Sequence, residues 1–216
     1  NKVLKPTAPD DLIEMAYGLI PQVLAAKAGK EKDDAKRKTG LEEAIAKFDD
    51  FLKRYSNSTQ TETIQYSRAV AAFQIGKYDA AAQSLQANLK AFPNSESILD
   101  SQFLLALCHM TQGAELAQQT AEQVNPAADA KFDEAEKLLA DIVAKQTDVS
   151  VANDAQYQLG ELLLNRAIFA PEGAKAGFFA KALAAYRAVL PKEGAVAAQE
   201  KRIGSFREKQ NAAIAA

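Results

Sequence analysis

The chain has 216 residues, of which 48% are hydrophobic and 25% are charged, and its formal net charge is −2. This composition is typical of a folded globular protein and excludes a disordered one. The near balance of acidic and basic residues argues against nucleic-acid binding, which needs a concentrated basic surface. Cys108 is the single cysteine, which excludes an intrachain disulfide and a cysteine-based metal site.

The sequence contains no run of about 18 or more apolar residues, so we expect no membrane insertion by this chain. It begins at Asn1 without a recognisable signal peptide, which fits either a processed start or a piece of a longer protein. The polar stretch 1–10 is expected to lead into the first helix.

Helical periodicity dominates the start of the chain. The acidic pair before Leu12 can cap a helix over 12–29, which Pro21 either kinks or divides. The charged stretch 30–40 is expected to be a solvated loop or an extension of the next helix. Apolar residues then recur every three or four positions over 41–58, which predicts a second helix.

The rest of the chain continues this pattern, and no segment shows the alternation of a strand. Gly76 marks a tight turn between two helices, and Pro126 and Pro171 separate later ones. Helices are predicted at 61–76, 78–92, 97–124, 130–146, 152–169, 179–190 and 195–211.

Small residues recur at equivalent positions in successive helix pairs. In the second helices they follow a large residue by three positions; they are Ala44, Ala81, Ala135 and Ala182. In the first helices they are Ala69, Ala106, Gly160 and Gly204. A small residue lets another helix cross close by, and stacked pairs together bury a core that one pair cannot. We therefore expect these positions to be buried where helices cross.

Residues 62–95 resemble the tetratricopeptide repeat, a helix–turn–helix unit of about 34 residues. The family's small, turn, aromatic, small, large and proline positions are occupied here by Ala69, Gly76, Tyr78, Ala81, Leu85 and Pro93. The resemblance implies an all-α fold, a right-handed superhelix of about four helix pairs with a C-terminal capping helix. We expect one domain over 1–216, with repeats at about 10–58, 62–95, 98–148 and 152–191 and a trailing helix at 195–216.

Three of the four pairs are longer than the family's unit. The surplus residues fall between the first and second helices, at 114–131 and 168–178, and the charged stretch 28–40 lies at the same place in the first pair. Long loops or extended helix ends are therefore expected to crowd one edge of the solenoid. The trailing segment 195–216 either caps the last pair or is the first half of a fifth.

The resemblance also implies where a partner would bind, because first helices line the concave face of such solenoids. A groove for an extended apolar segment or an amphipathic helix is expected there. Alternatively, these side chains fill the core, as aromatic residues at helical spacing usually do. Chaperone-binding members hold a peptide carboxylate with Lys and Asn, which are absent at these positions. The expected partner-binding residues are Tyr66, Val70, Phe73, Phe103, Leu107, Met110, Tyr157, Glu161 and Leu164.

The sequence offers no pattern for catalysis, cofactor binding or metal binding. Cys108 and His109 are adjacent on a helix, so their side chains point about 100° apart and cannot share one metal. Because the chain has no second histidine to act as a base, we expect a buried cysteine beside a half-buried histidine. We therefore predict that the protein is not an enzyme and has no cofactor.

The favoured function is a non-enzymatic scaffold that binds a peptide or protein segment through the concave groove or the long-loop edge. One alternative is a scaffold for cell-envelope assembly or self-association, so a homo-oligomer stays open. A second alternative is a carrier of an apolar ligand or lipid. The helix endings "FLKRYSNS" and "LKAFPNS" are similar to those of bacterial cell-envelope tetratricopeptide proteins, which favours the periplasm or cell envelope over the cytoplasm.

Overall fold

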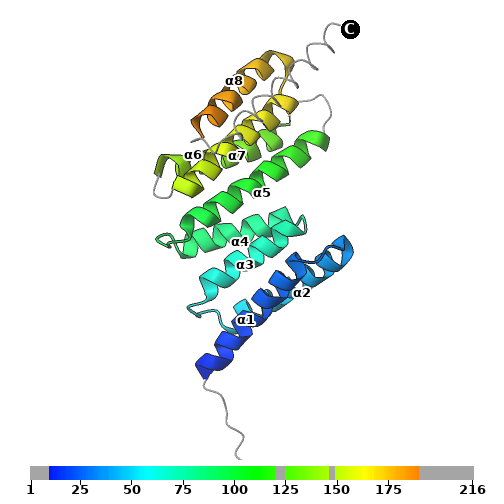
Figure 1. Cartoon of the computed structure of the whole chain (residues 1–216), viewed down its shortest axis with the longest axis vertical. Helices are drawn as coiled ribbons and strands as arrows, with labels where there is room; N and C mark the ends of the chain where they lie inside the picture. Colours follow the sequence, from blue (N-terminus) through cyan, green and yellow to red (C-terminus); the bar gives the residue numbers. More distant parts are fainter. Residues whose placement is uncertain (1–9, 120–124, 146–148, 190–216) are drawn as a thin grey trace, which may run out of the picture. The chain divides into compact units, whose positions relative to one another are not determined.

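A computed structural model describes residues 10–119, 125–145 and 149–189, and every element in these ranges is a helix (Figure 1). The prediction of an all-α fold built from neighbouring helix pairs is therefore confirmed. The trailing segment 195–216 and Gly204 lie outside the described residues. The helices are α1 (Asp10–Gly29), α2 (Asp34–Arg54), α3 (Thr61–Gln74), α4 (Tyr78–Ala91), α5 (Ile98–Gln119), α6 (Pro126–Lys145), α7 (Val149–Phe169) and α8 (Glu172–Ala188).

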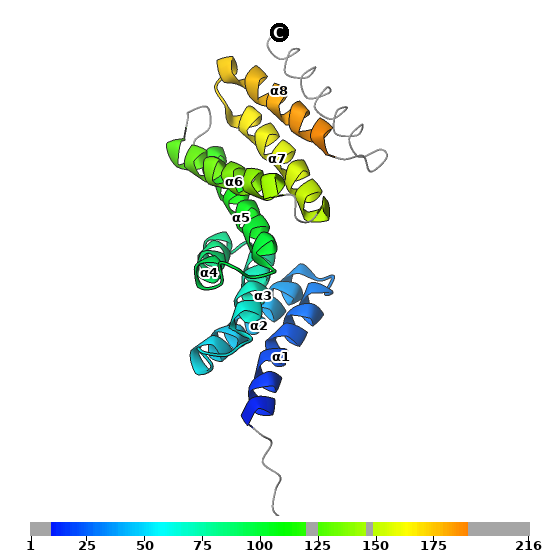
Figure 2. The same ribbon diagram turned by 90° about the vertical axis from the view of Figure 1, so that its left-hand side faces the viewer.

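The helices form two compact units, one over Asn1–Ser95 and one over Glu96–Ala216. In the first unit α1 packs on α2, α3 packs on α4, and α3 also contacts both α2 and α1. In the second unit α5 pairs with α6 and α7 pairs with α8, while α7 also contacts α6 and α5 (Figure 2). Each unit therefore stacks two hairpins, with contact between their first helices, as helical repeats do.

Local capping explains where two of the helices begin. Asp33 caps α2, since its carboxylate accepts a hydrogen bond from the backbone N–H of Lys36 at 3.0 Å. Most of the charged stretch 30–40 is thus an extension of α2. Asn125 starts α6 in the same way, because its Oδ1 accepts from the N–H groups of Ala127 at 3.0 Å and Ala128 at 3.3 Å.

Pro21 lies inside α1, which runs without a break from Asp10 to Gly29. Proline lacks the N–H that a helix interior uses, so the hydrogen bonds around it are disturbed. The side chain of Gln22 supplies a local donor, since its Nε2 bonds the carbonyl of Gly18 at 3.0 Å. Pro21 itself is buried, so its ring contributes to the packing of the first unit.

The small residues are buried, as their spacing predicted. None of Ala44, Ala81, Ala135 and Ala182 has exposed surface, and the same holds for Ala69 and Ala106. At Gly160 a Cβ would lie 2.5 Å from Cε1 of Tyr186, and at Gly113 it would lie 2.8 Å from the ring of Phe132. These contacts join α7 to α8 and α5 to α6, so small residues set how closely the paired helices approach.

Candidate functional site

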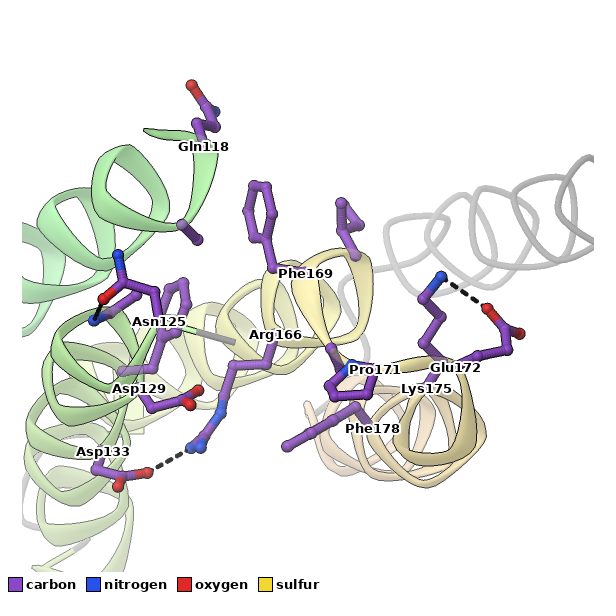
Figure 3. A pocket seen from close by; sticks show the side chains of 15 residues that line it. Gln118, Asn125, Asp129, Asp133, Arg166, Phe169, Pro171, Glu172, Lys175 and Phe178 are labelled. Atoms are coloured by element: carbon purple, nitrogen blue, oxygen red, sulfur yellow. Dashed lines mark hydrogen bonds and ion pairs between the residues drawn. The ribbon is translucent and has the colours of Figure 1, made fainter. Parts of the chain in front are cut away.

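A cavity of about 940 Å³ lies in the second unit, where α5 and α7 end and where α6 and α8 begin. We call it the helix-end pocket (Figure 3). Its lining comes from Ala117 and Gln118, from 125–133, from 166–172, and from Lys175 and Phe178. It is therefore built largely from 114–131 and 168–178, the two stretches of surplus length.

The side chain of Arg166 extends across this pocket from α7 (Figure 3). Its Nη1 donates to Asp133 Oδ1 at 2.7 Å and to Glu136 Oε2 at 2.8 Å, both on α6. Its guanidinium carbon lies 5.0 Å from the centre of the Phe178 ring of α8. Only 13% of the Arg166 side chain is exposed, so two carboxylates and one aromatic ring fix the guanidinium among three helices.

The Nε of Arg166 is buried and has no hydrogen-bond partner. A guanidinium that is largely buried needs its charge and its donors matched. The two carboxylates of α6 match the charge, while one donor stays unused. Deleting Arg166 would leave Asp133 and Glu136 facing each other without a cation, so its primary effect would be structural.

The rest of the lining mixes apolar side chains with polar and charged ones, among them Gln118, Asn125 and Asp129. Phe169 and Phe178 are half-buried, and Ile168 is 39% exposed. At the rim, Lys175 Nζ lies 2.8 Å from Glu172 Oε2 (Figure 3). Aromatic and aliphatic surface with charges of both signs suits a protein segment that carries an apolar anchor between polar groups.

Three of the expected groove residues lie on α3 of the first unit. Tyr66 and Val70 of α3 are half-buried and line a hollow of about 500 Å³, with residues of the second half of α1 forming its other wall. Phe73 is also half-buried, but its ring packs edge-on against Tyr78 at 5.3 Å. The structure therefore brings two of the three expected residues of α3 to a surface hollow.

The expected groove residues of the second unit are more involved in packing. Phe103 and Met110 of α5 are half-buried and contact a core cluster, and Leu107 is half-buried as well. On α7 the ring of Tyr157 packs 5.7 Å from that of Tyr186.

Two further members of this set on α7 also make contacts within the protein. Glu161 accepts a hydrogen bond from the Tyr186 hydroxyl at 2.6 Å. Leu164 is only 4% exposed and belongs to a core cluster, so it is not available to a partner. The continuous groove over α3, α5 and α7 stays a prediction.

The Cys108–His109 pair is part of the core. Cys108 has no exposed surface, and burial raises the pKa of its thiol to about 12, so the thiolate is not populated near neutral pH.

The expectation of a half-buried His109 is wrong, because its side chain is 3% exposed. Its Nδ1 lies 2.9 Å from Gln112 Oε1 and 3.4 Å from Glu134 Oε2 of α6. Burial lowers the pKa of His109, which favours the neutral imidazole.

Residues 25–190 match the YfiO family model, which is described as an outer membrane lipoprotein. The chain belongs to this family. Membership confirms the resemblance to cell-envelope repeat proteins and places this YfiO-family chain in the envelope rather than the cytoplasm. No curated protein matches the chain.

The described helices of this YfiO-family chain lack two kinds of feature. None of these helices is both long enough and apolar enough to span a membrane. Within the same part of the chain, no three His, Cys, Asp or Glu residues lie close enough together to hold a metal ion.

Arg166, the central residue of the helix-end pocket, is not among the residues predicted from the sequence. One feature of the sequence does point to it: Arg166 is the one charged residue in the otherwise mostly apolar stretch 162–169. A charge in such a stretch is buried only where partners compensate it. Those partners lie on other helices, at Asp133, Glu136 and Phe178, and no local pattern connects them.

Proposed function

We propose that the chain is a non-enzymatic scaffold of the cell envelope that binds a protein segment in the helix-end pocket. One observation carries the proposal: the surplus helical residues of two successive hairpins converge on one hollow of about 940 Å³. Pockets that bind ligands or anchoring side chains span about 300–1,000 Å³. Membership of an outer membrane lipoprotein family supports a scaffold of the cell envelope.

The chemistry of the lining supports a protein partner. Aromatic residues and arginine dominate the binding energy of protein interfaces, and they act best in desolvated pockets. Here Phe169, Phe178 and Arg166 are already held in place before a partner arrives, so little side-chain entropy is lost on binding. A carrier of apolar ligands would need a cavity free of charge, whereas this lining includes Asp129 and Lys175.

The hollow between α1 and α3 is a second candidate site. It contains Tyr66 and Val70, two residues that the repeat register assigns to the concave face. An extended segment lying there would run along first helices, as in the groove expected from the sequence. Its volume of about 500 Å³ is smaller than that of the helix-end pocket.

Affinity capture from the envelope fraction of the source organism shows which of the two sites binds a partner protein. The immobilised chain is compared with a pocket variant, Ile168→Asp with Lys175→Glu, and with a groove variant, Tyr66→Ala with Val70→Asp. Ala87→Asp, at an exposed position of α4, is the matched control. Arg166 is left unchanged, because its removal would disturb the packing of α6, α7 and α8.

We expect the wild type, the groove variant and the control to retain the same proteins, and the pocket variant to lose them by about tenfold or more. Loss by the groove variant alone would assign binding to the α1–α3 hollow instead. Retention of every captured protein by the pocket variant would contradict the proposal. Circular dichroism of each variant verifies that the helices are intact.

A further inference from the structure

The first helix, α1, is apolar on two opposite faces. It carries no charged residue from Met15 to Ala26. One face, which includes Tyr17, Pro21 and Ala28, packs into the first unit. Six large apolar residues on the other face are between 38% and 64% exposed; they are Leu12, Ile13, Met15, Leu19, Ile20 and Val23. A helix that is apolar all round is normally buried on all sides.

We propose that this exposed face of α1 binds the same face of a second copy of the chain, with the two helices antiparallel. Most positions on the face are symmetric about the midpoint between Tyr17 and Gly18, with Ile13 as the exception, because its counterpart is Gln22. An antiparallel pair therefore brings Leu12 opposite Val23 of the second copy, Met15 opposite Ile20, and Ala16 opposite Leu19. A two-fold interface requires this self-complementarity, since each contact must occur twice.

The charges of α1 favour the same arrangement. Its start carries the exposed Asp10, and its last turn carries Lys27. Glu14 also lies near the start, but its carboxylate accepts a hydrogen bond from the Ser58 hydroxyl of the same chain. In an antiparallel pair Lys27 of each copy lies toward the acidic start of the other, and the two helix dipoles oppose each other favourably. A parallel pair would instead bring the two acidic starts together. The sequence of α1 thus selects the antiparallel orientation.

A bilayer surface fits this face less well. Helices that lie in a membrane interface carry many basic residues beside their apolar face. In α1 the only basic residue is Lys27, while the residues at its start are acidic. Its opposite face is packed in the protein rather than solvated, so the charged face typical of such helices is absent from α1.

The dimer is expected to be weak, because one helix pair buries less than the roughly 1,200–2,000 Å² of a stable specific interface. Sedimentation equilibrium over about 1–300 μM covers the corresponding micromolar range. We expect the apparent mass to rise with concentration from 23.3 kDa toward twice that value. Leu19→Glu, at the centre of the face, should stay monomeric, whereas Ala87→Glu on α4 should behave like the wild type.

A charge exchange tests the orientation independently of the apolar contact. Lys27→Glu should weaken the dimer by about tenfold, and adding Asp10→Lys to the same chain should restore it. Failure of the second change to restore the dimer would overturn the antiparallel register. Both residues are exposed, so neither change is expected to disturb the fold.

Vesicles of phosphatidylethanolamine and phosphatidylglycerol test whether a membrane surface, rather than a second copy of the chain, covers the exposed face of α1. We expect the wild type not to co-sediment with them. A chain that is monomeric at every concentration, but binds these vesicles in a way that Leu19→Glu abolishes, would assign the face to the membrane and overturn the proposal. A monomer that binds no vesicles would overturn it as well.

Discussion

The α3–α4 hairpin of the first unit and the hairpins of the second unit follow the same packing rule: a small buried residue lets the two helices of a hairpin approach closely. They differ in length. Helices α3 and α4 have 14 residues each, whereas α5 to α8 have 22, 20, 21 and 17. Ala81, Ala135 and Ala182 are equally buried in their hairpins. The ends of α5 to α8 enclose the helix-end pocket of about 940 Å³. The middle of each hairpin is therefore fixed by packing, while extra turns at its ends are free to carry binding.

The largest effect is expected in the longer hairpins, at the contact of α7 with α8. Gly160→Leu should lower the free energy of unfolding by about 3 kcal/mol, because the new side chain overlaps the Tyr186 ring. Gly177→Leu on α8 is the matched control, since nothing lies within 4 Å of a Cβ there. Urea unfolding followed by circular dichroism measures both variants, and equal stabilities would refute the packing rule in this unit.

A smaller effect is expected in the short hairpin. Ala81→Leu should cost about 2 kcal/mol by forcing α3 and α4 apart, whereas Ala87→Leu on the exposed side of α4 should cost little. Hydrogen exchange should show lost protection in α3 and α4. If Ala81→Leu is tolerated as well as Ala87→Leu, the first unit does not depend on close helix approach.

The smallest effect is expected at the turn that keeps the first unit's hairpin short. Gly76 has φ of +76°, in the left-handed region, and nothing lies within 4 Å of a Cβ placed there. Gly76→Ala should therefore cost about 1 kcal/mol through backbone strain alone. Gly173→Ala is a suitable comparison, because its backbone is not left-handed. A thermal melt in which both variants match the wild type would show that the turn is not strained.

Much of the fold could be predicted from the sequence because its determinants are local. The spacing of Ala44, Ala81 and Ala135 relative to a preceding large residue marks each hairpin, and all three are buried. The surplus stretches also marked where helix ends would extend. Whether 30–40 was loop or helix depended on one capping hydrogen bond from Asp33, which composition does not reveal.

The candidate site was less predictable because distant residues build it. Arg166 becomes the centre of the helix-end pocket only through carboxylates 30 and 33 residues away in sequence and an aromatic ring on the next helix. His109 was misjudged for a related reason, since α6 covers it with Lys131 and Glu134. Tyr157 satisfied the groove register, yet its ring packs against Tyr186, which periodicity alone does not show.

A double-mutant cycle between Gly160 and Tyr186 tests the packing rule most directly. A Cβ at Gly160 would lie 2.5 Å from the Tyr186 ring, so Gly160→Ala should destabilise the wild type by about 1–2 kcal/mol. In a Tyr186→Leu background the obstructing ring is gone, and most of that cost should disappear, leaving a coupling energy of about 1 kcal/mol or more. Additive losses in the double variant would contradict the claim that a small residue against its partner helix holds each hairpin together.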